Sequence, residues 1–251
     1  MDSGYYAACT GLAAQTQALE LIADNLANLS TTGYRAQQAT FRSLLTGPGT
    51  VPLNPLNAVI NSFGLLSGSR VDLTPANLSA TGNPLDLGLG GNGFFAVQSG
   101  QQILYTRNGS FHVAPNGQLM TASGATVLAE QTNPLAPPVP VNLPAGDITV
   151  SADGTISVNS AVVAKLRLAE FSPETSLTAE GNSLYSAPAQ AEQPAVATSV
   201  HQGMLENSNV NPMQSVVQLI TVQRNTEMLQ RALTVLDSQL NLAAVQDLPH
   251  V

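Results

Sequence analysis

The C-terminal part of the chain contains the stretch that decides the fold, residues 211–244, which read NPMQSVVQLITVQRNTEMLQRALTVLDSQLNLAA. Asn211 is a good helix cap, Pro212 suits the first helical position, and Gln214 stands three residues after the cap, as in a capping box. The positions that follow mark a heptad seam in steps of three and four, in which only Thr226 is polar: Leu219, Val222, Thr226, Leu229, Leu233, Leu236, Leu240 and Ala243. The pattern predicts one helix about 50 Å long, which the segment 247–249 ends.

The N-terminal residues 5–29 show the same periodicity, with no proline and only Gly11 to weaken a helix. Their seam runs in steps of four and three through Tyr5, Cys9, Leu12, Thr16, Leu19, Ala23 and Leu26. Residues 30–33 then end the helix, because Gly33 can take a positive φ. We expect the two terminal helices to form a coiled-coil layer of their own. The alternative is two amphipathic helices that pack on the middle of the chain.

The middle of the chain, from about residue 83 to 171, has the pattern of antiparallel strands. Short runs such as residues 103–106, 155–158 and 162–171 alternate apolar and polar positions. Pairs that favour tight hairpin turns separate these runs: Asn108-Gly109, Asn116-Gly117, Ser123-Gly124 and Asp153-Gly154. The sequence therefore predicts an α+β protein, with terminal helices around a mainly antiparallel β middle.

Two connectors divide the chain further. Residues 43–69 carry no charge and contain Pro and Gly clusters, and residues 186–198 contain two prolines and five alanines. We expect four parts in order: an N-terminal helix of the axial domain, a Pro/Gly-rich linker, a β-rich middle domain and a C-terminal helix of the axial domain. Their boundaries are 1–42, 43–74, 75–200 and 201–251.

Composition excludes several classes of function. The 251 residues carry a net charge of −8, with only eight Lys and Arg, and charged residues make up 10% of the chain. Such a surface does not neutralise phosphates, which argues against binding nucleic acid or anionic lipid. No apolar run approaches the length that spans a bilayer, and the first residues do not have the pattern of a cleaved signal peptide. The single cysteine, Cys9, forms neither an internal disulfide nor a cysteine-based zinc site.

No pattern in the sequence indicates catalysis. Residues 88–93 match a dinucleotide-binding fingerprint, but they lead into the strand-like Phe94–Gln98 instead of a helix, so we expect a turn or bulge and no cofactor. His112, His201 and His250 lack a second ligand three or four residues away, so we expect no metal site. The prediction is therefore a protein that is not an enzyme.

Several stretches resemble one family. Residues 24–35, DNLANLSTTGYR, and residues 205–211, LENSNVN, are similar to the terminal signatures of bacterial flagellar basal-body rod and hook proteins, the axial family. The middle resembles the same family in four further stretches, which are 84–86, 91–95, 105–111 and 116–119. Three residues depart from the family pattern: Asp24 stands where Asn is usual, Arg35 where Lys is common, and Thr226 where an aromatic residue is typical.

The resemblance implies a structural subunit that is exported by the flagellar export apparatus and polymerises through its terminal helices into the rod spanning the periplasm. Its expected partners are copies of itself and other rod or hook proteins, with no nucleic acid and no membrane insertion. Length, residues 33–37 and residues 166–168 look most like the proximal-rod member. The alternatives are a distal-rod or hook member or, in a different class, a secreted β-rich adhesin.

We expect the assembly interface to contain the seam residues and the signature residues next to the helices. They are Leu12, Leu19, Leu26, Asn25, Asn28, Thr31, Gly33, Tyr34, Asn209, Val210, Asn211, Leu219, Val222, Leu229, Leu233, Leu236 and Leu240.

Overall fold

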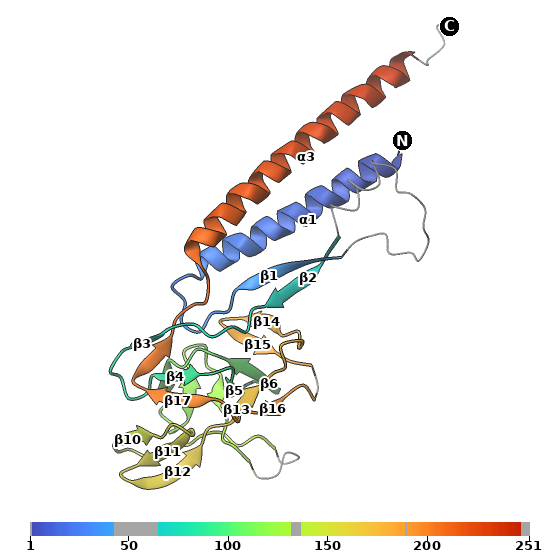
Figure 1. Ribbon diagram of the computed structural model, residues 1–251. Helices are drawn as coiled ribbons and strands as arrows, with labels where there is room; N and C mark the ends of the chain where they lie inside the picture. Colours follow the sequence, from blue (N-terminus) through green and yellow to red (C-terminus); the bar gives the residue numbers. More distant parts are fainter. Residues whose placement is uncertain (1, 43–64, 132–136, 189, 247–251) are drawn as a thin grey trace. The chain divides into compact units, whose positions relative to one another are not determined.

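The computed structural model describes residues 2–42, 65–131, 137–188 and 190–246 (Figure 1). The chain forms two compact units. The helical unit consists of Met1–Ala27, Gln37–Ser69 and Asn211–Val251, and the β unit of Asn28–Ala36 and Arg70–Val210.

The helical unit contains two long helices, α1 (Asp2–Ala27) and α3 (Pro212–Gln246). They pack against each other and run in opposite directions (Figure 1). β1 (Gln37–Arg42) pairs with β2 (Leu65–Val71). Terminal helices in contact and a largely antiparallel β region between them confirm the α+β class.

The start of α3 and its seam agree with the sequence pattern. Asn211 caps the helix, because its Oδ1 accepts from the Gln214 N–H at 3.2 Å and its carbonyl from the Ser215 N–H at 2.9 Å. Leu229 is buried, and the other described seam side chains are half-buried: Leu219, Val222, Thr226 and Leu233. Leu236 and Leu240 lie on the helix, but their side chains, like that of Ala243, lie outside the described residues. The segment 247–249 lies outside them as well.

The seam expected on α1 is wrong by about one position. The buried residues are Gly11, Ala14, Ala18 and Asn25, whereas Leu12, Leu19 and Leu26 are half-buried and Thr16 and Ala23 are exposed. The physical reason is that α1 contacts β1 as well as α3. A helix with two neighbours buries its small residues where the backbones approach, and its leucines then cover the margins of the contact.

The β unit consists of short strands. They are β3 (Leu78–Ala80), β4 (Leu87–Gly90), β5 (Phe94–Ser99), β6 (Gln102–Thr106), β7 (Phe111–Val113), β8 (Leu119–Thr121), β9 (Thr126–Val127), β10 (Ile148–Val150), β11 (Thr155–Val158), β12 (Ala161–Lys165), β13 (Leu168–Glu170), β14 (Thr178–Gly181), β15 (Leu184–Ser186), β16 (Gln193–Pro194), β17 (Ser199–Gln202) and β18 (Met204–Glu206). The largest sheet has the order β14-β15-β6-β5-β9-β8-β7, with β13 between β5 and β16. A second sheet has the order β10-β11-β12, and β17 pairs with β4 and β18 with β3. These pairings are antiparallel.

Strand β5 is buried on both of its faces. Phe94 and Ala96 belong to one apolar cluster, with Tyr105, Phe171 and Tyr185, because alternate residues of a strand point to opposite sides. Phe95 and Val97 belong to the other, larger cluster. The residues of β5 thereby join two cores into one folded unit.

Three of the four predicted hairpin turns are confirmed. Asn116-Gly117 joins β7 to β8, Ser123-Gly124 joins β8 to β9, and Asp153-Gly154 joins β10 to β11, each with a positive φ at the glycine. The hairpin at Asn108-Gly109 is wrong, since β6 pairs with β5 and β15 whereas β7 pairs with β8. Gly109 instead lets two backbones approach: a Cβ there would lie 1.7 Å from the Leu87 carbonyl oxygen.

The expected linkers are partly structured. Most of the uncharged linker, residues 43–64, lies outside the described residues, and β2 occupies residues 65–71. The second connector contains β16, and the expected boundary at residue 200 falls within β17. In the part of the chain that the structure describes, neither helix is apolar enough over a sufficient length to cross a membrane.

Candidate functional site

Three of the stretches that carried the family resemblance meet inside the β unit. Residues 33–36, 107–109 and 206–209 lie together there with Tyr185, and we call this group the junction. The Gly33 N–H donates to the Glu206 carbonyl at 2.8 Å, and the Asn209 N–H donates to the Tyr34 carbonyl at 3.3 Å. The segments that lead to the two terminal helices are therefore hydrogen-bonded to each other.

A buried ion network occupies the centre of the junction. Glu206 accepts from Arg35 Nη2 on Oε1 at 2.5 Å and from Arg107 Nη1 on Oε2 at 3.1 Å, and all three side chains have 0% of their surface exposed. The Ala76 N–H also donates to Glu206 Oε1, at 2.8 Å. Buried charges are tolerated only when they are paired and hydrogen-bonded, so each of these groups depends on the others.

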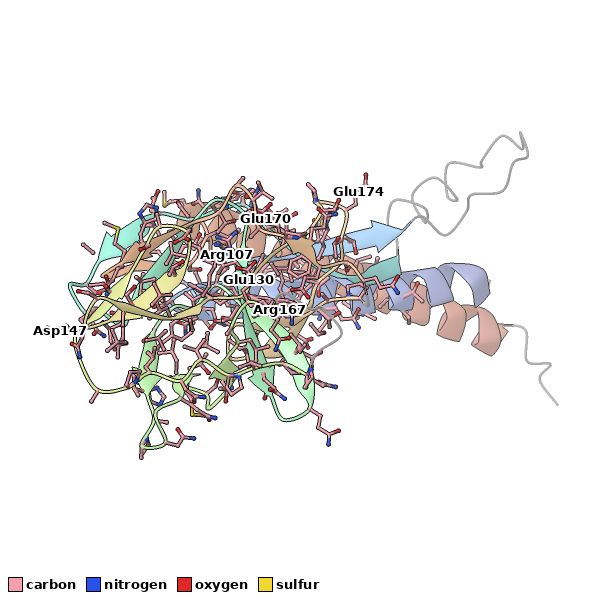
Figure 2. The ribbon with its side chains drawn as sticks, turned by 90° about the horizontal axis from the view of Figure 1, so that it is seen from below. Arg107, Glu130, Asp147, Arg167, Glu170 and Glu174 are labelled. Carbon is pink, nitrogen blue, oxygen red and sulfur yellow. The ribbon has the colours of Figure 1, made fainter. Side chains whose placement is uncertain are left out.

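Arg107 also contacts the aromatic core. Its Nη2 donates to the Gly91 carbonyl at 2.9 Å, and its guanidinium carbon lies 4.7 Å from the centre of the Phe94 ring. Burial lowers the pKa of Arg107 to about 10, and the charge of Glu206 opposes that shift. The side chain therefore stays protonated at neutral pH. Figure 2 shows Arg107 within the body of the β unit, whereas Asp147 lies exposed at its periphery.

The Asn209 side-chain amide and the Tyr185 hydroxyl form hydrogen bonds with backbone groups around this network. The Arg35 N–H donates to the Tyr185 hydroxyl at 2.9 Å, and the Ala36 N–H to Asn209 Oδ1 at 2.6 Å. Asn209 Nδ2 donates to the carbonyls of Asp72 and Thr74, both at 3.1 Å. The chain passes between the units at four points, next to residues 28, 36, 70 and 210. Asn209 thus ties together backbone near the last three of these crossing points.

Gly33 is a second junction position, besides Gly109, where the backbone requires glycine. Its φ is +67°, and a Cβ would lie 2.2 Å from the Asn108 backbone nitrogen. A side chain would both strain the left-handed backbone and push residues 33–36 away from the loop that carries Arg107.

The remaining expected interface residues have contacts within the chain. Asn25 holds β1 to the end of α1, because its amide donates to and accepts from the Gln37 backbone at 2.8 Å each. Thr31 donates to the side chain of Asn28 at 3.1 Å, and Tyr34 and Val210 are buried. An assembly role for these residues stays a prediction.

Sequence reasoning missed the three residues that hold the junction together, Arg107, Glu206 and Tyr185. A signal was present for two of them. Charged residues are only 10% of the chain, and Arg107 and Glu206 both stand inside stretches that resemble the family. Nothing in the sequence distinguishes Tyr185, whose role depends on the pairing of β15 with β6.

The described residues do not have the arrangement of a metal centre. They contain no cluster of three His, Cys, Asp or Glu side chains suited to a metal ion. His112 lies on β7 and His201 on β17, and His250 lies outside the described residues. The glycine-rich residues 88–93 lead from β4 into β5, which is a strand and not a helix.

Helix α3 has a second apolar face that α1 does not cover. Its exposed large apolar side chains are Met213, Val216, Val217, Ile220, Met228 and Val235, with exposed fractions of 42–79%. The exposed charged residues Arg224, Glu227 and Arg231 lie on the same side of the helix and interrupt this apolar surface. Exposed apolar side chains gathered on one side of a helix are typical of sites of protein–protein contact.

Comparison with known proteins gives matches along most of the chain. The family model for flagella basal body rod proteins matches residues 6–35, the flagellar hook protein FlgE/F/G D1 domain matches residues 88–158, and the flagellar basal body rod FlgEFG C-terminal model matches residues 201–244. The flagellar basal-body rod protein FlgF of Escherichia coli is 34% identical over 97% of both chains. FlgF of Salmonella typhimurium is 34% identical over 94% of this chain and 95% of its own. The rod protein FlgG of Buchnera aphidicola from Baizongia pistaciae is 32% identical over 96% and 98%.

A β unit in which the segments next to the two terminal helices meet, and a helix with exposed apolar side chains, are features of a structural protein. The chain belongs to the flagellar basal-body rod protein family. It is therefore a structural component of the rod and not an enzyme.

Proposed function

We propose that the protein polymerises through its terminal helices, beside copies of itself and other rod proteins, into the axial shaft of the flagellum. The observation that carries this proposal is the uncovered apolar face of α3. Met228 on that face is 61% exposed, whereas its neighbour Leu229 is 6% exposed. The helix therefore has one face for α1 and another for a different chain.

The chemistry of this face suits a helical filament. Helix α3 carries four charged residues in 35, and three of them, Arg224, Glu227 and Arg231, lie on this face, which is therefore apolar with a few charges of both signs. Contacts between two different surfaces of identical subunits generate a ring where the rotation between subunits closes and an open helical filament where it does not, and we propose the second case. We propose that the interface also uses the leucines at the margins of the seams and the signature residues named above.

The proposals about export, position and subtype rest on the resemblance to the flagellar rod family. We propose export by the flagellar export apparatus without a cleaved signal peptide, and a position in the rod across the periplasm. Relatives named FlgF and FlgG match at similar identities, 31–34% and 31–32%. We favour the proximal-rod type because of the chain length and residues 33–37 and 166–168. Cross-linking in isolated basal bodies tests this: a proximal subunit cross-links to neighbours near the membrane ring, and a distal one near the hook.

We propose that the β-rich middle domain folds as one domain together with residues 28–36, which follow α1, and residues 203–210, which precede α3. The expected domain, residues 75–200, would then need β18 and the Arg35 segment to complete its ion network.

Two adjacent substitutions test assembly through α3. Met228→Asp places a carboxylate on the uncovered face, so we expect the helical circular dichroism of the monomer to stay unchanged while incorporation into rods is lost. Leu229→Asp places the same charge between the two helices, so it should also reduce the helical signal of the monomer. Cells with either variant should lack hooks and filaments.

Gln230→Asp is the matched control, because it adds the same charge at an exposed polar position of the same helix. This variant should assemble normally. Normal rods built from Met228→Asp subunits would contradict the proposal.

A further inference from the structure

The ion network connects parts of the chain that are far apart in sequence. Arg35 belongs to the segment that follows α1, Glu206 to the strand that precedes α3, and Arg107 to the loop between β6 and β7. Glu206 binds both arginines and the Ala76 N–H. The charge of Glu170 also acts on Arg107. The Glu206 carboxylate, in the segment before α3, thus binds the Arg35 guanidinium, in the segment after α1.

We propose that the Arg35–Glu206–Arg107 network couples the docking of two segments of the β unit, so that they pack on the rest of that unit together and not independently. The segments are residues 28–36, which follow α1 and are called the N-terminal end, and residues 203–210, which precede α3 and are called the C-terminal end. This is a conformational property of the single chain, and it goes beyond the role in the rod.

The coupling follows from what each end loses when the other leaves. Without residues 203–210, the Arg35 and Arg107 guanidinium groups would be two like charges without the Glu206 carboxylate between them. Without residues 28–36, Glu206 would keep Arg107 and the Ala76 N–H but lose its shortest ion pair. Removing one member of a buried pair is strongly destabilising, so the dependence acts in both directions, and by linkage the coupling free energy is the same for both ends.

Hydrogen bonds of the backbone also couple the two ends. The bonds from Gly33 N–H to Glu206 and from Asn209 N–H to Tyr34 join the two ends directly, as does the bond from Ala36 N–H to Asn209 Oδ1. Each end also has a bond to the β unit that does not involve the other. For the N-terminal end this bond is Arg35 N–H to the Tyr185 hydroxyl, and for the C-terminal end it is Asn207 N–H to the Asn77 carbonyl.

The hydrogen-exchange rates of the Arg35 and Asn207 amides report the coupling, because neither N–H is hydrogen-bonded to the opposite end. In the full-length monomer, Arg35→Met removes the cation and keeps an unbranched side chain. We expect the Asn207 amide to exchange hydrogen about tenfold faster in this variant, the size of a typical coupling between sites. Glu206→Gln should accelerate the Arg35 amide by at least as much. Arg35→Lys keeps the charge and should accelerate the Asn207 amide less than Arg35→Met does.

Arg167→Met is the matched control, because Arg167 pairs with Glu192 at 2.6 Å in the same unit but outside the junction. Arg167→Met should leave the exchange rates of the Arg35 and Asn207 amides within about twofold of those in the original protein. The Ile156 amide on β11 separates coupling from general destabilisation, and it should not change in any variant. The proposal fails if Arg35→Met leaves the Asn207 amide unaltered, or if Ile156 accelerates as much as Asn207. Because the readout is made on monomers, this result is independent of whether the protein assembles through α3.

Discussion

The two units of the molecule bury their apolar residues to very different extents. In the β unit, four successive residues of β5, Phe94–Val97, have 0% of their surface exposed. In α3, Ser215 and Leu229 are the buried residues among the side chains that the structure describes. The β unit has a core of its own, whereas several large apolar side chains of α3 are exposed. The function proposed above thus places stability mainly in the β unit and assembly in the helical unit.

The most sensitive test of this difference is hydrogen exchange in the monomer. We expect amides of β5 to exchange on the order of a thousandfold more slowly than amides in the middle of α1 and α3, because opening a helix pair with so few buried residues costs little free energy. Mass spectrometry of peptides from both units measures the two rates in one experiment. Equal, strong protection of residues 5–27 and 212–244 in a verified monomer would show a rigid, prefolded helix pair and contradict the comparison.

The sequence predicted the regular elements of both units because their signals are local. The Asn211 cap, the seam of α3 and three glycine turns depend on residues within a few positions of one another. The hairpins at Asn159-Ser160 and Asn182-Ser183 were missed because both residues of each pair adopt a positive φ, which is unfavourable for serine.

The largest change expected from one substitution is in the core of the β unit. Phe94→Ala removes a ring whose centre lies 5.6 Å from that of Phe171 and 6.1 Å from that of Tyr185, and on which Arg107 packs. We expect a loss of about 3–5 kcal/mol in the free energy of unfolding of the β unit. Calorimetry should show its melting transition at a lower temperature.

The matched substitution in the helical unit is Leu219→Ala. Leu219 is only half-buried, so it should change the same transition by less than about 1 kcal/mol. Similar effects of the two substitutions on that transition would mean that the helices contribute directly to the stability of the β unit.

The junction shows what the sequence does not reveal. Gly33 was recognised as a turn residue, and its positive φ is observed. Its second requirement, the approach to the Asn108 backbone, depends on a loop that lies 75 residues further along the chain. The pairing of Arg35 and Arg107 with Glu206 is equally non-local. Resemblance marked these stretches as important, but only the fold shows that they contact one another.

A smaller predicted effect than that of Phe94→Ala concerns pH and a side chain of the β unit, Tyr185. Burial raises the pKa of Tyr185 to about 12, whereas an unfolded tyrosine titrates near about 10. The native state therefore holds this proton more tightly than the unfolded state does. The contribution to stability is complete below about pH 10 and is lost as the pH rises through about 12, because the unfolded state then binds fewer protons.

For Tyr185 this linkage amounts to about 1 kcal/mol between pH 9 and pH 11. Tyr185→Phe removes the titrating proton, so the free energy of unfolding of this variant should fall less over that interval, by about that amount. It also removes the acceptor of the Arg35 N–H, which should lower stability at pH 7 by about 1 kcal/mol. Urea unfolding at pH 7, 9 and 11, followed by circular dichroism, measures both effects. Arg107 and Tyr105 are present in both proteins, so the difference between them isolates Tyr185. An equal fall with pH in the two proteins would show that the alkaline sensitivity arises elsewhere, and the Tyr185 hydroxyl would then have no part in it.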